Sequence, residues 1–169
     1  PNYGSFVIPQ VMTGAEKLVR WLASTDLCHS LAEVLQVINT FVGFYQMLPA
    51  PSKIPASARA IYRQESWGAF PVSGTHLYRA FQFHSDLERE GTIEPERMIF
   101  IAGCNRETLA GLRIVAPGEF DYSITYNGDG RVPYELGVLK DVPAYYVDES
   151  HGDLMRNEKV LAAVDELLE

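Results

Sequence analysis

A run of apolar residues in the second half of the chain constrains the fold more than any other feature. Residues 97–104, RMIFIAGC, are apolar except for the first and have the length of a β-strand. Such a run is typical of a parallel strand that other elements cover on both faces. The pattern changes to this extended type only after Pro95, so we expect the sheet to lie in the second half.

The segments after this run alternate between extended pieces and turns. Residues 112–125 predict two strands joined at Pro117–Glu119, and residues 134–139 predict a short extended piece. A further strand is expected over 144–149, and a final amphipathic helix over 157–168. Strands and loops followed by a helix predict the edge of an α/β sheet.

The first half of the chain is expected to be mostly helical. Residues 1–6 read as a loop, and apolar residues at helical spacing predict helices over 14–23, 30–48, 57–67 and 75–90. Asp26 or Ser30 is expected to cap the second helix. That helix has a broad apolar stripe, which favours core packing over a lipid-facing lid. The prolines of 49–55 interrupt the helices.

Composition excludes several classes of protein. The 169 residues are 47% hydrophobic, which fits a folded domain with a sizeable core. A net charge of -8 with 14 scattered basic residues argues against a nucleic-acid surface. No apolar run has the length of a membrane helix, and no signal peptide is evident. We expect an acidic, soluble protein and slightly favour the cytoplasm.

Cysteine, histidine and aromatic residues outside the turns are expected to serve packing. Cys28 and Cys104 have apolar neighbours in the sequence and are expected to be buried and reduced. The predicted helices include three histidines, which we expect on solvated faces, namely His29, His76 and His84. The spacing of His84 and Asp86 does not suit two ligands on one helix, so we expect no metal and no cofactor. The larger aromatic residues are read as core or lid packing, namely Trp21, Trp67, Phe81 and Phe83.

Two turns carry the residues that are suited to acid–base chemistry. Asp129 stands between two glycines in YNGDGRVPYE (126–135), directly after a predicted strand. His151 follows the last predicted strand, in ESHGDL (149–154). Residues just beyond the carboxyl ends of strands line the ligand crevice of open α/β sheets. A carboxylate that reaches a histidine can orient the ring and stabilise its imidazolium, as in a Ser-His-Asp triad. Glycine-rich turns are also common as surface turns.

Two other carboxylates compete for the same role. Asp148 and Asp153 flank His151, and either offers a rival acid or a metal ligand. Asp148 is predicted to lie in a strand, and no third histidine or cysteine supports a metal site. We therefore assign Asp129 as the acid and His151 as the base.

The motifs resemble the α/β-hydrolase family, in particular lipases and acyltransferases related to lecithin:cholesterol acyltransferase. GDGRVP is similar to the GDGTVP acid turn of that group, and SHGDL before a last helix resembles its histidine loop. PNYGS resembles the segment GTPNxGS that follows a sheet strand, and the block ending in YQMLP resembles the inserted lid. The resemblance runs through nearly the whole chain, but is strong only at PNYGS and from Met98 onward.

The resemblance implies a fold and a division of the chain. The expected class is α/β, as the C-terminal portion of an α/β-hydrolase sheet with a helical lid insertion. Residues 1–94 would be the lid or cap region after a core strand, and residues 95–169 the core strands and last helix. The expected nucleophile motif, G-x-S-x-G, is absent, and Ser5, Ser73 and Ser150 do not fit it.

These observations predict the C-terminal part of a serine esterase, lipase or acyltransferase. Asp129 and His151 would serve a serine upstream of Pro1, and this piece alone would be inactive. The expected partners are the missing N-terminal part, an ester or lipid substrate, and a second copy through an exposed sheet edge. The alternatives are a catalytically inactive hydrolase-like interaction module and a small self-contained domain with a purely structural GDG turn.

Overall fold

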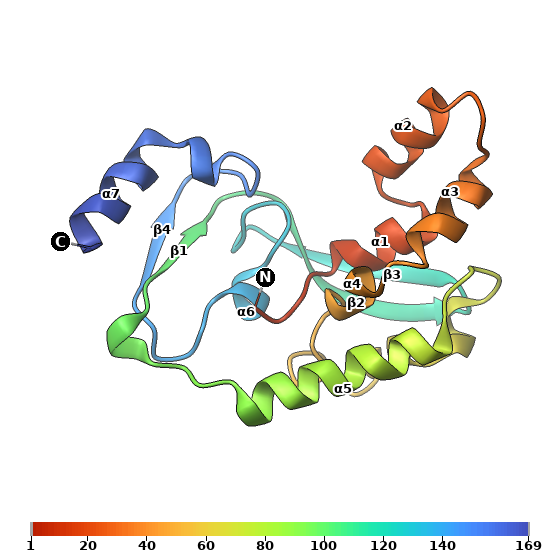
Figure 1. Cartoon of the computed structure of the whole chain (residues 1–169), viewed down its shortest axis with the longest axis horizontal. Helices are drawn as coiled ribbons and strands as arrows, with labels where there is room; N and C mark the ends of the chain where they lie inside the picture. Colours follow the sequence, from red (N-terminus) through yellow and green to blue (C-terminus); the bar gives the residue numbers. More distant parts are fainter. Residues whose placement is uncertain (1, 169) are drawn as a thin grey trace.

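Helices dominate the first half of the chain, and all strands of the described residues lie in the second half (Figure 1). The computed structural model describes residues 2–168. The helices before residue 95 are α1 (Val7–Thr13), α2 (Lys17–Thr25), α3 (Leu31–Ile38), α4 (Val42–Gln46), η1 (Ala58–Tyr62), η2 (Gln64–Trp67) and α5 (Gly74–Glu90). The later elements are η3 (Pro95–Arg97), β1 (Phe100–Gly103), β2 (Thr108–Ala116), β3 (Glu119–Thr125), α6 (Tyr134–Gly137), β4 (Ala144–Val147), η4 (Leu154–Arg156) and α7 (Glu158–Leu168).

The strands form two separate sheets of two strands each. β1 and β4 are parallel and pair from Phe100 with Ala144 to Gly103 with Val147. β2 and β3 form an antiparallel hairpin whose turn contains Gly118 at a φ of 79°. The strands predicted over 97–104, 112–125 and 144–149 are confirmed, and so is the mixed helix and strand composition. Among the described residues, β1 has a strand neighbour on one side only.

Several predicted elements differ in the structure. The segment 30–48 is two helices, because the buried Asn39 ends α3 with its amide donating to the carbonyls of Leu35 and Met12. Ser30 caps α3, as expected, through a reciprocal pair of bonds with Glu33. Residues 57–67 form two short 3₁₀ helices instead of one α-helix.

The α-helices α1 and α6 were not expected from the pattern. α1 begins directly after the loop at the start of the chain, and Pro9 lies in its first turn, where its missing N–H is not needed. The segment 134–139 was predicted to be extended but begins with α6. Pro133 precedes α6 as its N-cap residue, and Tyr134 N–H donates to the carbonyl of Asn127, which ties the helix to the preceding turn.

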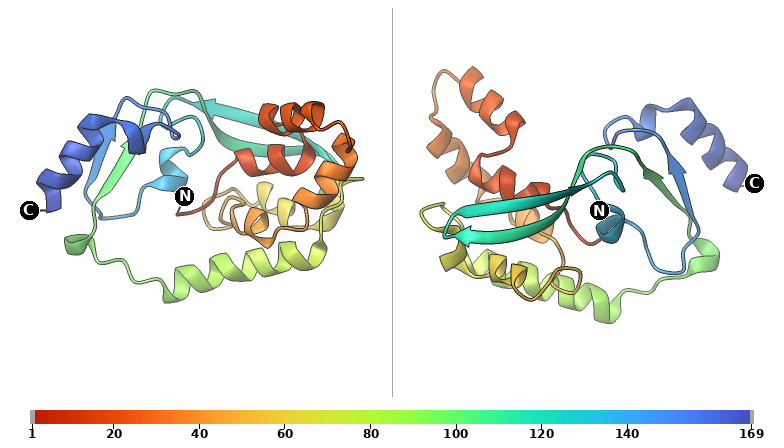
Figure 2. Two further views of the ribbon diagram at one scale, coloured as in Figure 1. Left: turned by 45° about the horizontal axis from the view of Figure 1, so that its top comes forward. Right: turned by 180° about the vertical axis from the view of Figure 1, so that it is seen from behind.

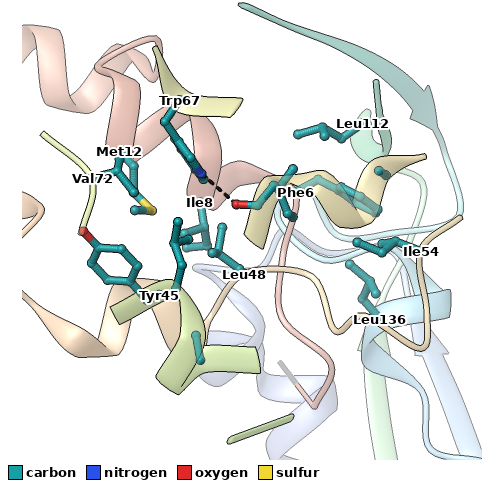
Figure 3. Packing of buried hydrophobic residues seen from close by; sticks show 14 residues of the cluster. Phe6, Ile8, Met12, Tyr45, Leu48, Ile54, Trp67, Val72, Leu112 and Leu136 are labelled. Carbon is teal, nitrogen blue, oxygen red and sulfur yellow. Dashed lines mark hydrogen bonds between the residues drawn. The ribbon is translucent and has the colours of Figure 1, made fainter. Parts of the chain in front are cut away.

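The main core joins the helical half to the hairpin and α6. Trp67 is fully buried in this core (Figure 3), donates from Nε1 to the Ile61 carbonyl at 2.7 Å and meets Phe120 of β3 edge-on. The buried members of this core are Phe6, Ile8, Met12, Tyr45, Leu48, Ile54, Ala58, Ile61, Trp67, Val72, Leu77, Ala80, Leu112 and Leu136. Within the described part of the chain, β1, β4 and α7 contribute none of them.

The two ends of the molecule differ in architecture. β1, β4 and α7 lie together at one end, and the pair of helices α2 and α3 projects at the other (Figure 2). Between residues 2 and 168, no helix has both the length and the apolar character needed to cross a bilayer.

Several side chains lie in environments that the sequence did not indicate. Cys28 was expected to be buried but is exposed, because it lies in the loop between α2 and α3. Cys104 is partly exposed, and both thiols are free. His84 was expected on a solvated face but is buried in α5, where Nε2 lies 3.0 Å from the Leu48 carbonyl. Burial lowers the pKa of His84 below its ordinary value of 6.5.

Replacing Trp67 with alanine should destabilise the fold severely. The change removes a fully buried indole and its hydrogen bond, and such truncations cost about 3–5 kcal/mol of unfolding free energy. Trp21→Ala is the matched control, because Trp21 is exposed and its loss should cost less than about 0.5 kcal/mol. Urea unfolding of both variants measures the difference. Equal losses would contradict the placement of Trp67 in the core.

His84 should make stability fall on acidification. Below about pH 6.5 the unfolded chain binds a proton on this histidine that the folded chain resists, so the unfolding free energy falls with pH. The slope from one such group is at most about 1.4 kcal/mol per pH unit. His84→Gln should flatten the slope between pH 6.5 and pH 5 in urea unfolding at a series of pH values.

His29→Gln provides the control for this pH series. The hydrogen bond to Asp26 raises the pKa of His29, so its contribution to stability is present at low pH and is lost as pH rises. This variant should not flatten the acid slope. Slopes that are the same in wild type and in His84→Gln would show that His84 does not control the acid sensitivity.

Candidate functional site

The structure brings Asp129 and His151 into contact across 22 positions of sequence. His151 Nδ1 lies 2.8 Å from Asp129 Oδ2, and the backbone N–H of His151 donates to the backbone carbonyl of Asp129 at 2.8 Å. Asp129 lies in the turn after β3 and His151 in the turn after β4. The pair predicted from strand ends is therefore joined by both side chain and backbone.

The two glycines explain how an aspartate fits this turn. Gly130 has a φ of 90° and donates its N–H to Thr108 Oγ1 at 2.8 Å. A Cβ on Gly128 would lie 2.7 Å from the same oxygen, so a larger residue would push β2 away. Glycine alone meets both requirements without strain. The turn can therefore lie directly on the buried Thr108.

The Asp129 carboxylate is fixed before it meets the histidine. Its Oδ1 accepts from the backbone N–H groups of Arg131 at 3.0 Å and Val132 at 2.8 Å. Its Oδ2 faces His151, and the residue is only 7% exposed. Each oxygen of the Asp129 carboxylate thus has its own hydrogen-bond partners, which leaves the carboxylate little freedom to rotate.

The histidine loop is held against the aspartate turn by Arg106 and Gly103. Arg106 donates its backbone N–H to the carbonyl of Gly128 at 3.1 Å, and its guanidinium forms an ion pair with Asp148. A Cβ on Gly103 would lie 2.7 Å from the Asp129 Cβ and 2.4 Å from the carbonyl oxygen of Glu149. Both segments therefore pass over β1 at a position where only glycine leaves room.

The rival acids are engaged elsewhere. The hydrogen bond from Arg106 lowers the pKa of Asp148, which follows β4 instead of lying within it. Asp153 Oδ2 accepts from Ser150 Oγ at 2.7 Å. Of the three carboxylates considered from the sequence, Asp129 is the one in hydrogen-bond contact with His151.

The contact between His151 Nδ1 and the Asp129 carboxylate favours the tautomer with the N–H on Nδ1. An ionised carboxylate only accepts hydrogen bonds, so Nδ1 is the N–H that faces Asp129. Nε2 then has a free lone pair. Within residues 2–168 it has no hydrogen-bond partner, and the side chain is 48% exposed. The ring is oriented to take a proton on Nε2 from a group that approaches from solvent.

A pocket of about 230 Å³ opens beside the pair. Asp129, His151 and Tyr134 line it together with Asn2 and residues of β1, and most of its surface is apolar. Burial raises the pKa of Tyr134 to about 12, and the neighbouring Cys104 thiol adds to the shift. The tyrosine is therefore a neutral hydroxyl at physiological pH.

The serines considered from the sequence have structural roles. Ser5 is buried and donates to the carbonyl of Arg131 at 2.5 Å, and Ser73 caps α5. Ser150 donates to Asp153. In the part of the chain that the structure describes, no serine is hydrogen-bonded to the His151 ring. In residues 2–168 the Asp129–His151 pair is therefore present without a serine bonded to its ring.

Four residues that hold the site were not identified from the sequence, namely Gly103, Arg106, Thr108 and Tyr134. Gly103 gave the one usable signal, because a glycine at the end of an apolar strand often marks a close approach of another backbone. The other three act through contacts between segments far apart in sequence. The described residues hold no group of three or more His, Cys, Asp or Glu suited to a metal ion.

Comparison with known proteins adds no family assignment. Neither the protein-family models nor the curated proteins and solved structures gave a significant match to this chain. The geometry of the site therefore carries the functional argument.

Replacing Gly103 with alanine should disturb the Asp129–His151 contact. The added methyl would overlap Asp129 and the Glu149 carbonyl, and forced overpacking costs about 1–3 kcal/mol. Gly152→Ala is the matched control, since a Cβ on Gly152 meets nothing within 4 Å. Thermal unfolding and the NMR signals of the His151 ring measure both variants. Equal behaviour of the two would contradict the close approach at Gly103.

Proposed function

We propose that this chain supplies the acid and the base of a serine hydrolase that acts on acyl esters, with lipid esters as the favoured class. The observation that carries the proposal is the hydrogen bond between Asp129 Oδ2 and His151 Nδ1 at 2.8 Å, in a histidine whose side chain is 48% exposed. This arrangement matches the orientation that a triad acid gives its histidine. The nucleophilic serine would belong to an upstream part of the same hydrolase.

The reaction follows from the orientation of the ring. His151 Nε2 takes the proton of the serine hydroxyl as the serine oxygen attacks the ester carbonyl, and Asp129 stabilises the resulting imidazolium. His151 then returns that proton to the leaving alcohol as the acyl–oxygen bond breaks. A water molecule, or an acceptor alcohol in acyl transfer, repeats the two steps and releases the acyl group.

The open edge of β1 supports the proposal that another segment completes the site. In a parallel pair, alternate residues of a strand bond to each neighbour. Phe100 N–H and Cys104 N–H donate to β4-side carbonyls, those of Pro143 and Val147. Ile101 alternates with these residues along the strand, so its backbone N–H and C=O face away from β4. A third strand along this edge would satisfy them and would lie beside the pocket that contains His151.

A second candidate function is binding of a partner along the open edge of β1, without catalysis. A hydrolase-like interaction module would bind its partner along β1 without a serine in reach of His151. The open edge favours it equally, because an unpaired strand also pairs with a second copy or with another chain. The oriented histidine is the observation that favours the hydrolase, since binding along β1 does not require a fixed ring.

The test is to replace Asp129 with asparagine in the hydrolase that contains this chain. Because Oδ1 accepts two backbone N–H groups, the asparagine would keep its oxygen there and turn its NH₂ toward His151 Nδ1. The ring would then carry its proton on Nε2, the wrong tautomer for a base. Ester hydrolysis should fall by about 10⁴-fold, and His151→Gln should have at least as large an effect.

Asp153→Asn is the control for this experiment, because Asp153 follows His151 closely in the sequence but binds Ser150 instead of the His151 ring. Its activity should remain near that of wild type. ¹⁵N chemical shifts of the His151 ring would report the change of tautomer in the Asp129→Asn protein independently of turnover. Full ester hydrolysis after loss of His151 would refute the proposal.

A further inference from the structure

Another pocket lies between η1 and α5 and shares no lining residue with the pocket beside Asp129 and His151. Its volume is about 530 Å³, a size that is typical of small-molecule sites. Its lining includes two arginines and three aromatic residues, namely Arg59, Arg63, Tyr62, Tyr78 and Phe81. We call it the arginine pocket.

The backbone of η1 directs the two arginines outward. Ala58 and Ile61 of this helix are buried in the main core, whereas Arg59 and Arg63 are exposed. The Ile61 carbonyl accepts from Trp67 Nε1 at 2.7 Å, which ties the end of η1 to the most bulky buried side chain. Both arginine side chains therefore start from a backbone that the core holds in place.

The aromatic side chains of the arginine pocket are not needed to pack α5. This helix is anchored in the core by Leu77, whereas Tyr78 is 65% exposed and Phe81 is also exposed. The Phe81 ring meets the Tyr62 ring edge-on, with the centroids 5.6 Å apart. Tyr62 is fixed in turn, since its hydroxyl donates to the Pro49 carbonyl at 3.1 Å. The pocket thus has exposed ring surface on an ordered base.

The positive charge of the arginine pocket is not neutralised by neighbouring carboxylates. Five other arginines of the chain form ion pairs, namely Arg89, Arg97, Arg106, Arg113 and Arg131. Within residues 2–168, neither Arg59 nor Arg63 is in an ion pair.

The surrounding segment is basic although the chain as a whole is acidic. Residues 50–85 contain a single acidic residue, Glu65, whereas the whole chain has a net charge of -8. The basic residues of this segment are Lys53, Arg59, Arg63 and Arg79. A local excess of positive charge in a concave site raises the local concentration of anions.

We propose that the arginine pocket binds a phosphate monoester that carries a planar ring, with nucleoside monophosphates as the matching class. A guanidinium group fits phosphate oxygens through two parallel N–H donors. A phosphate monoester carries nearly two negative charges at neutral pH, which matches the two unpaired arginines. The exposed rings of Tyr78 and Phe81 offer a surface on which a base can stack. This inference is independent of the proposed hydrolase activity.

The test is calorimetric titration of the intact chain with adenosine 5′-monophosphate. We expect saturable binding at one site that weakens as salt is added, because the contact is between charges at an exposed surface. Adenosine lacks the phosphate and inorganic phosphate lacks the ring, so each should bind about tenfold more weakly or less. No saturable binding of the monophosphate at millimolar concentration would overturn the proposal. Inorganic phosphate or adenosine binding as tightly as the monophosphate would overturn it as well.

Two variants assign the binding to the arginine pocket. Arg63→Gln removes one charged donor, and Tyr78→Ala removes a stacking surface; each should weaken binding of the monophosphate about tenfold. Both side chains are exposed, so thermal unfolding without ligand should match wild type.

Arg156→Gln is the matched control for the loss of charge. Arg156 is an exposed arginine of η4 that lies outside the arginine pocket and has no ion pair within residues 2–168. This variant should bind the monophosphate as wild type does. Equal weakening in Arg63→Gln and Arg156→Gln, or unchanged binding in Arg63→Gln, would overturn the assignment. Binding is measured without ester turnover, so failure of the hydrolase proposal would be seen separately.

Discussion

Asp129 binds His151 twice, once through its carboxylate and once through its backbone carbonyl, and the organisation of the site depends on this double contact. The carboxylate can serve the ring because its other oxygen is occupied by two backbone N–H groups of the same turn. Groups fixed in this way need no reorganisation when charge develops on the histidine, which is how preorganised sites stabilise an imidazolium. The surrounding glycines matter because they allow the turn to reach this position.

A second layer of contacts holds the two turns together. Arg106 joins them directly, since its backbone pairs with the aspartate turn while its guanidinium binds Asp148 ahead of the histidine. Exposed ion pairs contribute little to stability, so the value of this one lies in alignment. Gly103 contributes by absence of a side chain, because the two segments meet above it. The site is therefore specified by small residues and backbone groups as much as by Asp129 and His151 themselves.

The sequence predicted the features that arise from local patterns. The apolar run before Cys104, the hairpin at Gly118 and the capping of α3 by Ser30 follow from residue type and spacing, and the structure contains all three. The pairing of Asp129 with His151 was predicted from their positions after strands, and the structure contains the contact, but β3 and β4 belong to separate two-stranded sheets instead of sharing one edge. The hydrolase resemblance remains an interpretation that rests on these motifs.

Features set by distant contacts were not predictable in the same way. The break at Asn39 depends on the Met12 carbonyl, and the burial of His84 depends on Leu48, each far away in the sequence. Periodicity describes one segment at a time and cannot report such partners. The exposure of Cys28 has the same origin, since apolar neighbours in the sequence do not reveal that a loop projects from the protein.

The distribution of the core has a consequence for how the histidine is presented. Asp129 lies on the well-packed part of the molecule, through Thr108 of β2 and through Val132, which packs against the core. His151 follows β4, and in the described chain the β1, β4 and α7 end shares no residue with that core. Regions with few buried contacts open at lower free energy than the rest of a protein, as separate cooperative units. His151 is therefore attached to the part of the molecule with fewer core contacts, and local opening of that part would separate the ring from Asp129.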